Sequence, residues 1–540
     1  MKNRKVSVSV SVLVFIICLT LYLIYPLNNK SPNIIIILTD DLGFSDIGVY
    51  GSEIQTPNID SLAKNGLQYL NFYNTGRCWP TRAALLSGHY PHKINRDIIV
   101  EKSISESNQT PFSNRPIWAE LLPMYLNENN YKSFFSGKWH IDGKPINNGF
   151  SQAYRLIDHD RHFDPIHHSE HGLPLPKIQG DQDFYSTANI TNYAIDYIND
   201  HQNNNESKSF FLYLAYTAPH FPLQAYDEDI KFYKNKYNEG WDKIREERNN
   251  RQKNLGLVFG DLSPINRKQG APYYDKDAYN LLGPNEIELP LHWQKLSIEQ
   301  KKFQSKKMEI HAAMVHRIDV EIGRVINLLK KQNIFDDTLI IFMSDNGASA
   351  EIMVRGDGHD PKKKPGSKGT YLSLGPGWSS VSNTPFKKHK TWVHEGGIAT
   401  PMIISWKNNI KDIGTTRNQR GHVIDILPTI LDIIGIDPIK VQKKLGRPAF
   451  DGKSIKYSFK NKTDNENTRS LWFHHDGHKA LIKDNYKLVA ERNNNWELYN
   501  IESDRTETKN LANKELLIFA DLIKEYNKIK NNILNGNEKN

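Results

Sequence analysis

Cysteine is rare in this 540-residue chain, and one of its two cysteines stands in a setting that suits chemistry. In "RCWPTRAALLSG", residues 77–88, Pro80 and Arg82 follow Cys78 closely, and "AALLSG" predicts a helix. A side chain at a helix N-terminus lies among free N–H groups, which favour negative charge, and Arg82 lies one turn further on. The segment predicts an anion pocket with a reactive group. A buried cysteine, with Arg82 paired to an acid, is the other interpretation.

Carboxylates follow two apolar runs that are far apart in the sequence. "NIIIILTDDLG" leads into Asp40 and Asp41, and "DTLIIFMSDNGAS" leads into Asp345 and Asn346. Such runs indicate strands buried on both faces, as in the interior of a parallel sheet. Three carboxylates and one amide oxygen suit Ca²⁺ or Mg²⁺ and not zinc. Acids that merely end a strand in a turn remain the alternative.

Two further strand candidates lead into basic residues. "SFFSGKWH" ends in Lys138 and His140, and "FFLYLAYTAPHFPL" reaches His220. In open α/β sheets, ligand sites form at the carboxyl ends of the strands. The four runs therefore predict one large α/β sheet whose polar residues gather at one edge.

The length of the chain predicts a large domain followed by a smaller one. An amphipathic helix is expected over 308–332, and the polar stretch 225–305 is interpreted as a solvated excursion with short helices. Short alternating runs between 470 and 501 predict an antiparallel meander, which a helix over 514–532 follows. The expected organisation is a catalytic domain over 30–430 and an α+β domain over 431–540.

The first 29 residues have the pattern of an export signal. Lys2, Arg4 and Lys5 precede a mostly apolar run that ends near Leu27. The run is nearly long enough to span a bilayer, so 1–29 is either a cleaved signal peptide or a membrane-anchoring segment. The protein is therefore expected outside the cytoplasm, in the periplasm or beyond.

The charge balance is mildly basic. Seventy Lys and Arg residues against 61 Asp and Glu residues give a net charge of +9, without a concentrated basic block. This balance does not predict a nucleic-acid partner. It suits an anionic substrate, and an ordinary basic surface explains it equally well.

Six motifs in order resemble those of one enzyme family. "CWPTRAALLSG" resembles the sulfatase signature C-x-P-x-R, and "TDDLG", "GKWH", "APHFPLQA", "SDNG" and "HKTWVHEGGIATP" occupy the family's remaining positions. The likeness spans residues 32–515 and is greatest to the arylsulfatase-like branch of the type I sulfatases. It implies the alkaline-phosphatase-like fold: a large mixed sheet flanked by helices, with a smaller C-terminal α+β domain that carries an antiparallel sheet.

The resemblance implies a modified cysteine and a metal ion. In the family, a maturation enzyme converts the cysteine corresponding to Cys78 into Cα-formylglycine, whose hydrate attacks the sulfur of a sulfate monoester. The second hydroxyl of the hydrate then loses its proton and expels sulfate. One Ca²⁺ would be held by Asp40, Asp41, Cys78, Asp345 and Asn346.

The same resemblance assigns five further catalytic residues. Arg82 would hydrogen-bond the formylglycine hydroxyl, and Lys138 and Lys390 would bind the sulfate oxygens. His140 would accept the proton of the second hydroxyl, and His220 would donate a proton to the leaving group or hydrogen-bond its oxygen.

The leaving group stays open between aryl and carbohydrate sulfates. A His-rich stretch, 158–172, is interpreted as a sugar-facing loop, a secondary metal site or, most simply, an exposed polar loop. Two alternative functions are a phosphonate or phosphate ester hydrolase of the same superfamily, and a non-catalytic sulfate-binding protein if Cys78 is unmodified. Substrate-facing loops are expected at 90–117, 155–183 and 352–380.

Overall fold

The computed structural model describes the chain from residue 31 to 535 with short gaps. The expected signal segment 1–29 lies outside the described residues. From Asn33 onward the described residues belong to one compact unit. None of the helices in this part of the chain is long and apolar enough to cross a membrane. The described ranges are 31–100, 104, 113–178, 183–204, 207–258, 260–356, 358–460 and 469–535.

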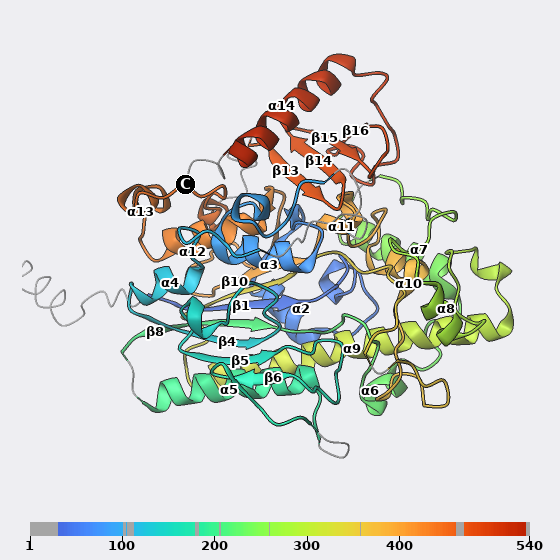
Figure 1. Ribbon diagram of the computed structural model, residues 1–540, viewed down its shortest axis with the longest axis horizontal. Coiled ribbons are helices and arrows are strands. Elements are labelled where there is room, and N and C mark those ends of the chain that lie inside the picture. The colour runs from blue at the N-terminus through green and yellow to red at the C-terminus, as the bar shows by residue number, and fades with distance from the viewer. Residues whose placement is uncertain are drawn as a thin grey trace, which may run out of the picture. The chain divides into compact units, whose positions relative to one another are not determined.

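A large mixed sheet is the centre of the structure (Figure 1). Its five inner strands, β9, β1, β8, β4 and β5, are parallel, and β10, β6 and β7 join antiparallel to their neighbours. The predicted mixed α/β sheet is therefore confirmed. In spatial order, its described strands are β11 (Thr415–Arg417), β2 (Gly66–Tyr69), β10 (Met402–Ser405), β9 (Thr338–Ser344), β1 (Asn33–Thr39), β8 (Ser209–Ala215), β4 (Tyr131–Gly137), β5 (Gln152–Leu156), β6 (His168–Glu170) and β7 (Leu173–Pro174).

The apolar run of β1 explains its central place. Every residue of β1 is buried, and successive side chains enter opposite core layers. Ile35 and Ile37 belong to one layer, whereas Ile34 and Ile36 belong to the other. Because successive side chains point to opposite faces of a strand, only a continuous apolar run satisfies a strand covered on both sides.

Helices cover both faces of the sheet. In Figure 1, α5 and α9 lie below the sheet, and α3, α4 and α12 lie above it. The helix α9 begins about ten residues before the predicted start, because Ser297 and Gln300 form a capping box ahead of the apolar pattern. The described helices include α2 (Pro57–Lys64), α3 (Cys78–Ser87), α4 (Leu122–Asn127), α5 (Ser186–Asn203), α6 (Asp227–Phe232), α7 (Gly240–Asn254), α8 (Lys276–Leu282), α9 (Ile298–Lys331), α10 (Gly375–Ser382), α11 (Glu395–Ile398), α12 (Ile426–Ile433) and α13 (Pro438–Lys444).

The segment 225–305 is less solvated than predicted. It does form short helices, but Trp241 is buried against Trp293 and Trp378, with ring centroids 4.7 and 5.6 Å away. Arg248 is also fully buried, and its guanidinium lies 2.7 Å from an Asp46 carboxylate oxygen. Composition alone therefore did not reveal that this segment also contributes buried residues and a buried ion pair.

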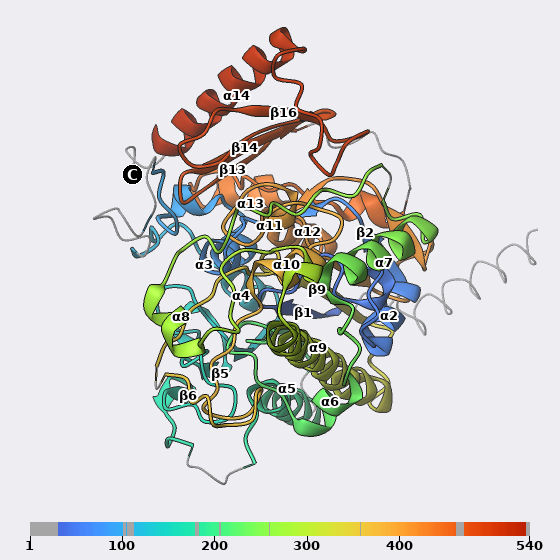
Figure 2. The same cartoon turned by 90° about the vertical axis from the view of Figure 1, so that its right-hand side faces the viewer.

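The predicted C-terminal meander is confirmed. Four consecutive antiparallel strands form a separate sheet, and α14 packs on β14 and β15 (Figure 2). The boundary at residue 430 stays a prediction. The elements are β13 (Leu471–His475), β14 (His478–Lys483), β15 (Tyr486–Ala490), β16 (Glu497–Asn500) and α14 (Leu516–Asn535).

Candidate active site

Cys78 is the first residue of α3 and is buried. Arg77 caps the helix start, and Gly88 ends the helix with a left-handed φ of 72°. Burial raises the pKa of the Cys78 thiol, although Lys138 and Lys390 oppose the rise. An unmodified Cys78 would therefore be mostly protonated at neutral pH, and a thiol is a poor nucleophile compared with a thiolate.

The predicted metal ligands meet at one edge of the sheet. Asp40 and Asp41 follow β1, whereas Asp345 and Asn346 follow β9, and these strands are parallel neighbours. Ligand atoms of Asp40, Cys78 and Asp345 all lie within 4.8 Å of one another. Parallel pairing thus brings together acids that are about three hundred residues apart in the sequence.

The donor set fits a hard divalent cation. Asp40 Oδ1 and Asn346 Oδ1 are buried and accept no hydrogen bond within the described chain. The amide nitrogen of Asn346 donates to Asp41 Oδ1 at 2.6 Å, which directs its own Oδ1 elsewhere. Buried acceptors without a partner are costly, and oxygen-only ligands suit Ca²⁺. The residues present therefore fit such an ion.

The pKa values of the three carboxyl groups are shifted in different directions. Burial, reinforced by Asp40, raises the pKa of Asp345 to about 7. Burial also raises the pKa of Asp41. At Asp40 the effect of burial is outweighed by Lys138, Arg82 and Lys390, so its pKa is lowered. Crowded buried acids of this kind would be stabilised by a nearby cation.

Arg82 is paired to an acid, as the second interpretation of the sequence anticipated. Its Nε and Nη2 atoms donate to Asp345 Oδ2 at 3.0 and 2.8 Å, and Nη1 donates to the Lys138 carbonyl at 2.7 Å. All three groups are buried. Arg82 thus links α3 to the ends of β9 and β4, and its predicted bond to a formylglycine hydroxyl stays a prediction.

Two buried lysines stand beside the acids. Lys138 Nζ donates to Asp40 Oδ2, and Lys390 Nζ donates to Asp41 Oδ2 at 2.9 Å. The approach of Lys138 depends on Gly137, which has a φ of 125° and where a Cβ would lie 1.8 Å from the Ala215 carbonyl oxygen. Only glycine permits this turn at the end of β4.

The two predicted catalytic histidines are held neutral. Burial, with help from the nearby lysines, lowers the pKa of His140 and of His220 well below the usual value. His220 Nδ1 lies 2.6 Å from the Phe221 carbonyl oxygen, so Nδ1 carries the proton and Nε2, 3.7 Å from Asp41 Oδ2, does not. His140 and Asp41 both have left-handed φ values, 53° and 67°, a strain that is typical of functional sites.

Sequence reasoning missed an ion-pair chain behind the cysteine. Arg77 Nη2 lies 3.0 Å from Glu351 Oε1, and Glu351 Oε2 lies 3.2 Å from Lys390 Nζ. Arg77 also donates to Thr391 Oγ1 at 2.8 Å. Glu351 is buried between two cations, which lower its pKa despite the opposing effect of burial. No local pattern signals this contact, because it joins segments that meet only in the fold.

The His-rich stretch 158–172 is not simply an exposed polar loop. The His159 ring lies 5.5 Å from that of His140 and 5.8 Å from that of His220, measured between centroids. His162 is buried and bonded to Ser186 Oγ and the His220 carbonyl, and His168 is also buried. The exposed-loop interpretation is wrong for His162 and His168, and His159 joins the candidate site.

A buried cluster of paired charges lies at the carboxyl edge of a mixed α/β sheet, and comparison with known proteins assigns the chain to a family with an alkaline-phosphatase-like fold. The "Sulfatase" family model matches residues 32–436, and "N-sulphoglucosamine sulphohydrolase, C-terminal" matches 386–532. The chain belongs to the sulfatase family and is a sulfatase, an enzyme that hydrolyses sulfate esters.

Curated relatives include other sulfatases. An uncharacterized sulfatase of Schizosaccharomyces pombe is 32% identical over 92% of both chains. An arylsulfatase of Klebsiella aerogenes is 29% identical over 76% of this chain and 88% of its own. The human N-acetylgalactosamine-6-sulfatase is 24% identical over 76% of this chain and 63% of its own.

Solved structures share the fold. The crystal structure of Ps i-CgsB in complex with k-i-k-neocarrahexaose matches with a TM-score of 0.62, 25% identity and 92% coverage of both chains. A protein in complex with its substrate D-glucosamine-2-N,6-O-disulfate matches with a TM-score of 0.62, 21% identity, and 95% and 100% coverage. The second likeness, below 25% identity, supports the fold alone.

Proposed function

We propose that the protein hydrolyses sulfate monoesters of saccharides through a Cα-formylglycine made from Cys78, with one Ca²⁺ held by Asp40, Asp41, Asp345 and Asn346. The main support for this proposal is the position of Cys78: the side chain is buried, and its sulfur lies within 4.8 Å of carboxylate oxygens of Asp40 and Asp345. Saccharide rather than aryl sulfates are proposed because Ps i-CgsB, at 25% identity, was solved with a carrahexaose.

The modification would replace a poorly nucleophilic thiol with a more reactive hydrated aldehyde. Because burial raises the pKa of the Cys78 thiol, the unmodified side chain would attack poorly. A hydrated formylglycine offers two hydroxyl groups, one to attack sulfur and one whose deprotonation releases sulfate. The ion, when bound, polarises a sulfate oxygen and lowers the pKa of the attacking hydroxyl.

Two lysines and two histidines of the chain would stabilise charge on the sulfate group and transfer protons. Lys138 and Lys390 place two buried positive charges beside Cys78, where they would stabilise the growing charge on sulfate oxygens. His140, neutral because of its lowered pKa, would accept a proton. The neutral Nε2 of His220 would have to take up a proton before it could donate one to a leaving group.

The direct test is the mass of the Cys78 peptide from protein made in its native host. Trypsin should cut after Arg77 and Arg82 and release "CWPTR". Replacement of sulfur and two hydrogens by one oxygen supports the proposal. An unmodified thiol in enzyme that still hydrolyses sulfate esters contradicts it. Sulfate and phosphonate esters of one phenol, compared on the same sample, separate this function from phosphonate ester hydrolysis.

We also propose that the protein is exported, either to the periplasm or beyond, and matured by a formylglycine-generating enzyme. The basic start and apolar run of 1–29 support export. N-terminal sequencing of the natural protein distinguishes a cleaved signal from a retained membrane anchor, and an intact N-terminus on cytoplasmic protein would contradict export.

A further inference from the structure

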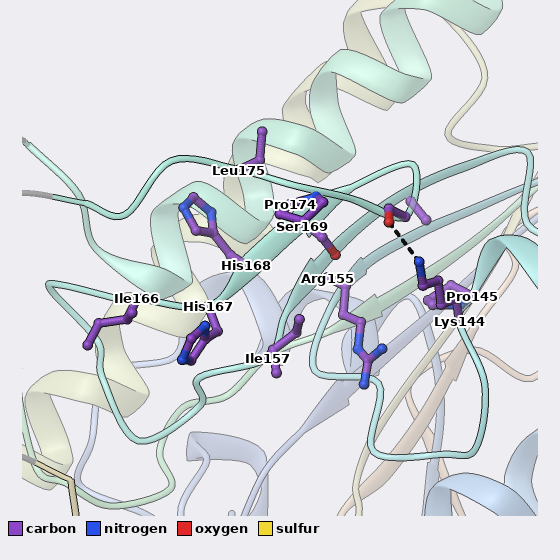
Figure 3. A pocket seen from close by; sticks show the side chains of 12 residues that line it. Lys144, Pro145, Arg155, Ile157, Ile166, His167, His168, Ser169, Pro174 and Leu175 are labelled. Carbon is purple, nitrogen blue, oxygen red and sulfur yellow. Dashed lines mark hydrogen bonds between the residues drawn. The ribbon is translucent and has the colours of Figure 1, made fainter.

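A second pocket lies at the edge of the sheet formed by β5, β6 and β7 (Figure 3). Its cavity of about 240 Å³ is lined by Lys144 and Arg155 and by the apolar side chains of Ile157 and Ile166, among others. His167 also lines it, and none of the described residues of the lining is an Asp or Glu. The pocket is therefore positively charged and partly apolar.

Arg155 is the central feature of this pocket. Its side chain is half-buried, yet it forms no hydrogen bond or ion pair within the described chain. The sheet fixes its place, because Arg155 pairs with Gly137 on one side and Ser169 on the other. A partly desolvated guanidinium without an acceptor is unfavourable, so the free protein holds a charge that an anion would satisfy.

Lys144 provides a second donor group. Its Nζ donates to the Gly172 carbonyl at 3.0 Å, which leaves two of its three N–H groups for a ligand (Figure 3). The side chain of Ile157 is 43% exposed beside Arg155. Two donors next to an exposed apolar wall suit a sugar that carries an anionic group.

The pocket adjoins the candidate active site through β5. Gly137, the register partner of Arg155, immediately precedes Lys138. Along the chain, His159 follows Ile157 by two residues, at most about 7 Å between Cα atoms. The His159 ring lies 5.5 Å from that of His140, so the segment that lines the pocket leads into the candidate site.

We propose that this pocket binds a second anionic group, a sulfate or a carboxylate, on an oligosaccharide whose reacting sulfate lies beside Cys78. The proposal rests on the proposed function and names its substrate class: multiply charged oligosaccharides rather than singly sulfated small molecules. Arg155 supplies the paired donors and Lys144 the additional charge.

Binding is tested on the full chain with Cys78→Ala, which prevents turnover. Isothermal calorimetry would use a carrageenan tetrasaccharide, whose anionic groups are all sulfates, and a chondroitin tetrasaccharide with a single sulfate, whose other anionic groups are carboxylates. Adding Arg155→Gln should raise the Kd of the preferred tetrasaccharide about tenfold, the loss expected for a hydrogen-bonded charge. Arg155→Lys, which keeps the charge, should lose less. Lys331→Gln removes an exposed lysine at the C-terminal end of α9 and should change nothing.

Enzyme kinetics provide an independent test of the role of Arg155. In otherwise wild-type enzyme, Arg155→Gln should lower the ratio of kcat/KM for the carrageenan tetrasaccharide to that for p-nitrophenyl sulfate about tenfold. The proposal is overturned if the Kd of folded Arg155→Gln equals that of its parent, or if neither tetrasaccharide binds. A protein that binds the tetrasaccharide through Arg155 but hydrolyses no sulfate ester would instead contradict the proposed function alone.

Discussion

The candidate active-site cluster around Cys78 and the pocket around Arg155 both contain basic side chains, but in the described chain only those of the cluster are paired with acids. At Cys78 the cations are buried and paired: Arg82 with Asp345, and Lys390 with Asp41 and Glu351. In the pocket, Arg155 has no partner in the described chain and lies partly in solvent. Paired charges fix a geometry before a ligand arrives, whereas an unpaired charge contributes affinity only after one binds.

Cys78→Ala should have the largest effect of the variants considered. If the buried cluster performs the chemistry, kcat/KM for p-nitrophenyl sulfate should fall on the order of 10⁴-fold, as for loss of a nucleophile in other hydrolases. Thermal unfolding should show an intact fold, since the side chain removed is small. Full activity in the variant would place the chemistry elsewhere.

Chelation of the proposed Ca²⁺ should have the next largest effect. Treatment with EGTA should lower activity on the order of 10²-fold and lower Tm, because Asp40, Asp41 and Asp345 would repel one another without a cation. Added Ca²⁺ should restore both. The Tm of Asp345→Asn should respond less to Ca²⁺, and equal behaviour with and without EGTA would remove the metal from the proposal.

Buried imidazoles near the cluster should make the fold acid-labile. Burial, with Lys388 and Arg245, lowers the pKa of His389 to about 3. Below about pH 6.5, His389 binds a proton in the unfolded chain but stays neutral in the folded chain. The free energy of unfolding therefore decreases as the pH is lowered. From pH 6.5 to 5 the loss should be about 2 kcal/mol, measured by urea unfolding.

Two His→Gln variants test whether His389 causes this pH dependence. His389→Gln retains a partner for Ser379, whose hydroxyl lies 3.0 Å from His389 Nδ1, and it should flatten the pH dependence. The exposed His292→Gln should leave it unchanged. An unaltered slope in His389→Gln would show that this imidazole is not responsible.

Glu351→Gln removes one negative charge from the buried ion-pair network of the candidate site. Arg77 and Lys390 would lose their shared acid, and kcat/KM should fall about tenfold through poorer placement of Lys390. Glu286→Gln is the control: it breaks a buried pair with Lys307 at 2.8 Å and should cost about 3 kcal/mol of stability while it preserves kcat. Equal kinetic effects would mean that Glu351 serves only stability.

Salt should produce the smallest effect and distinguish the two regions directly. Raising NaCl from about 0.05 M to about 0.5 M screens exposed charges more than buried ones. The KM of a carrageenan tetrasaccharide should rise about threefold more than that of p-nitrophenyl sulfate. Parallel changes for the two substrates would remove the distinction between the open pocket and the closed cluster.

Much of the fold followed from local pattern. The short apolar runs of β1, β8 and β9 predicted buried parallel strands because a strand covered on both faces needs apolar side chains at every position. The alternating runs after residue 470 predicted the antiparallel sheet for a similar reason. The extended start of α9 was missed, because its first turns depend on a cap and not on apolar periodicity.

In the candidate site, too, some features could be predicted from the sequence and others could not. The sequence alone determined which side chains follow each strand, and the motif around Cys78 indicated the chemistry of the pocket. Their partners are visible only in the folded chain: Asp345 pairs with Arg82, Glu351 lies between Arg77 and Lys390, and His159 lies beside His140. Those contacts join segments that are distant in the chain, and hydrophobic periodicity reports which face a residue occupies but not which residue lies opposite. The unpaired Arg155 is the clearest case, since an arginine in a strand shows whether it has a partner only once the neighbouring strands are in place.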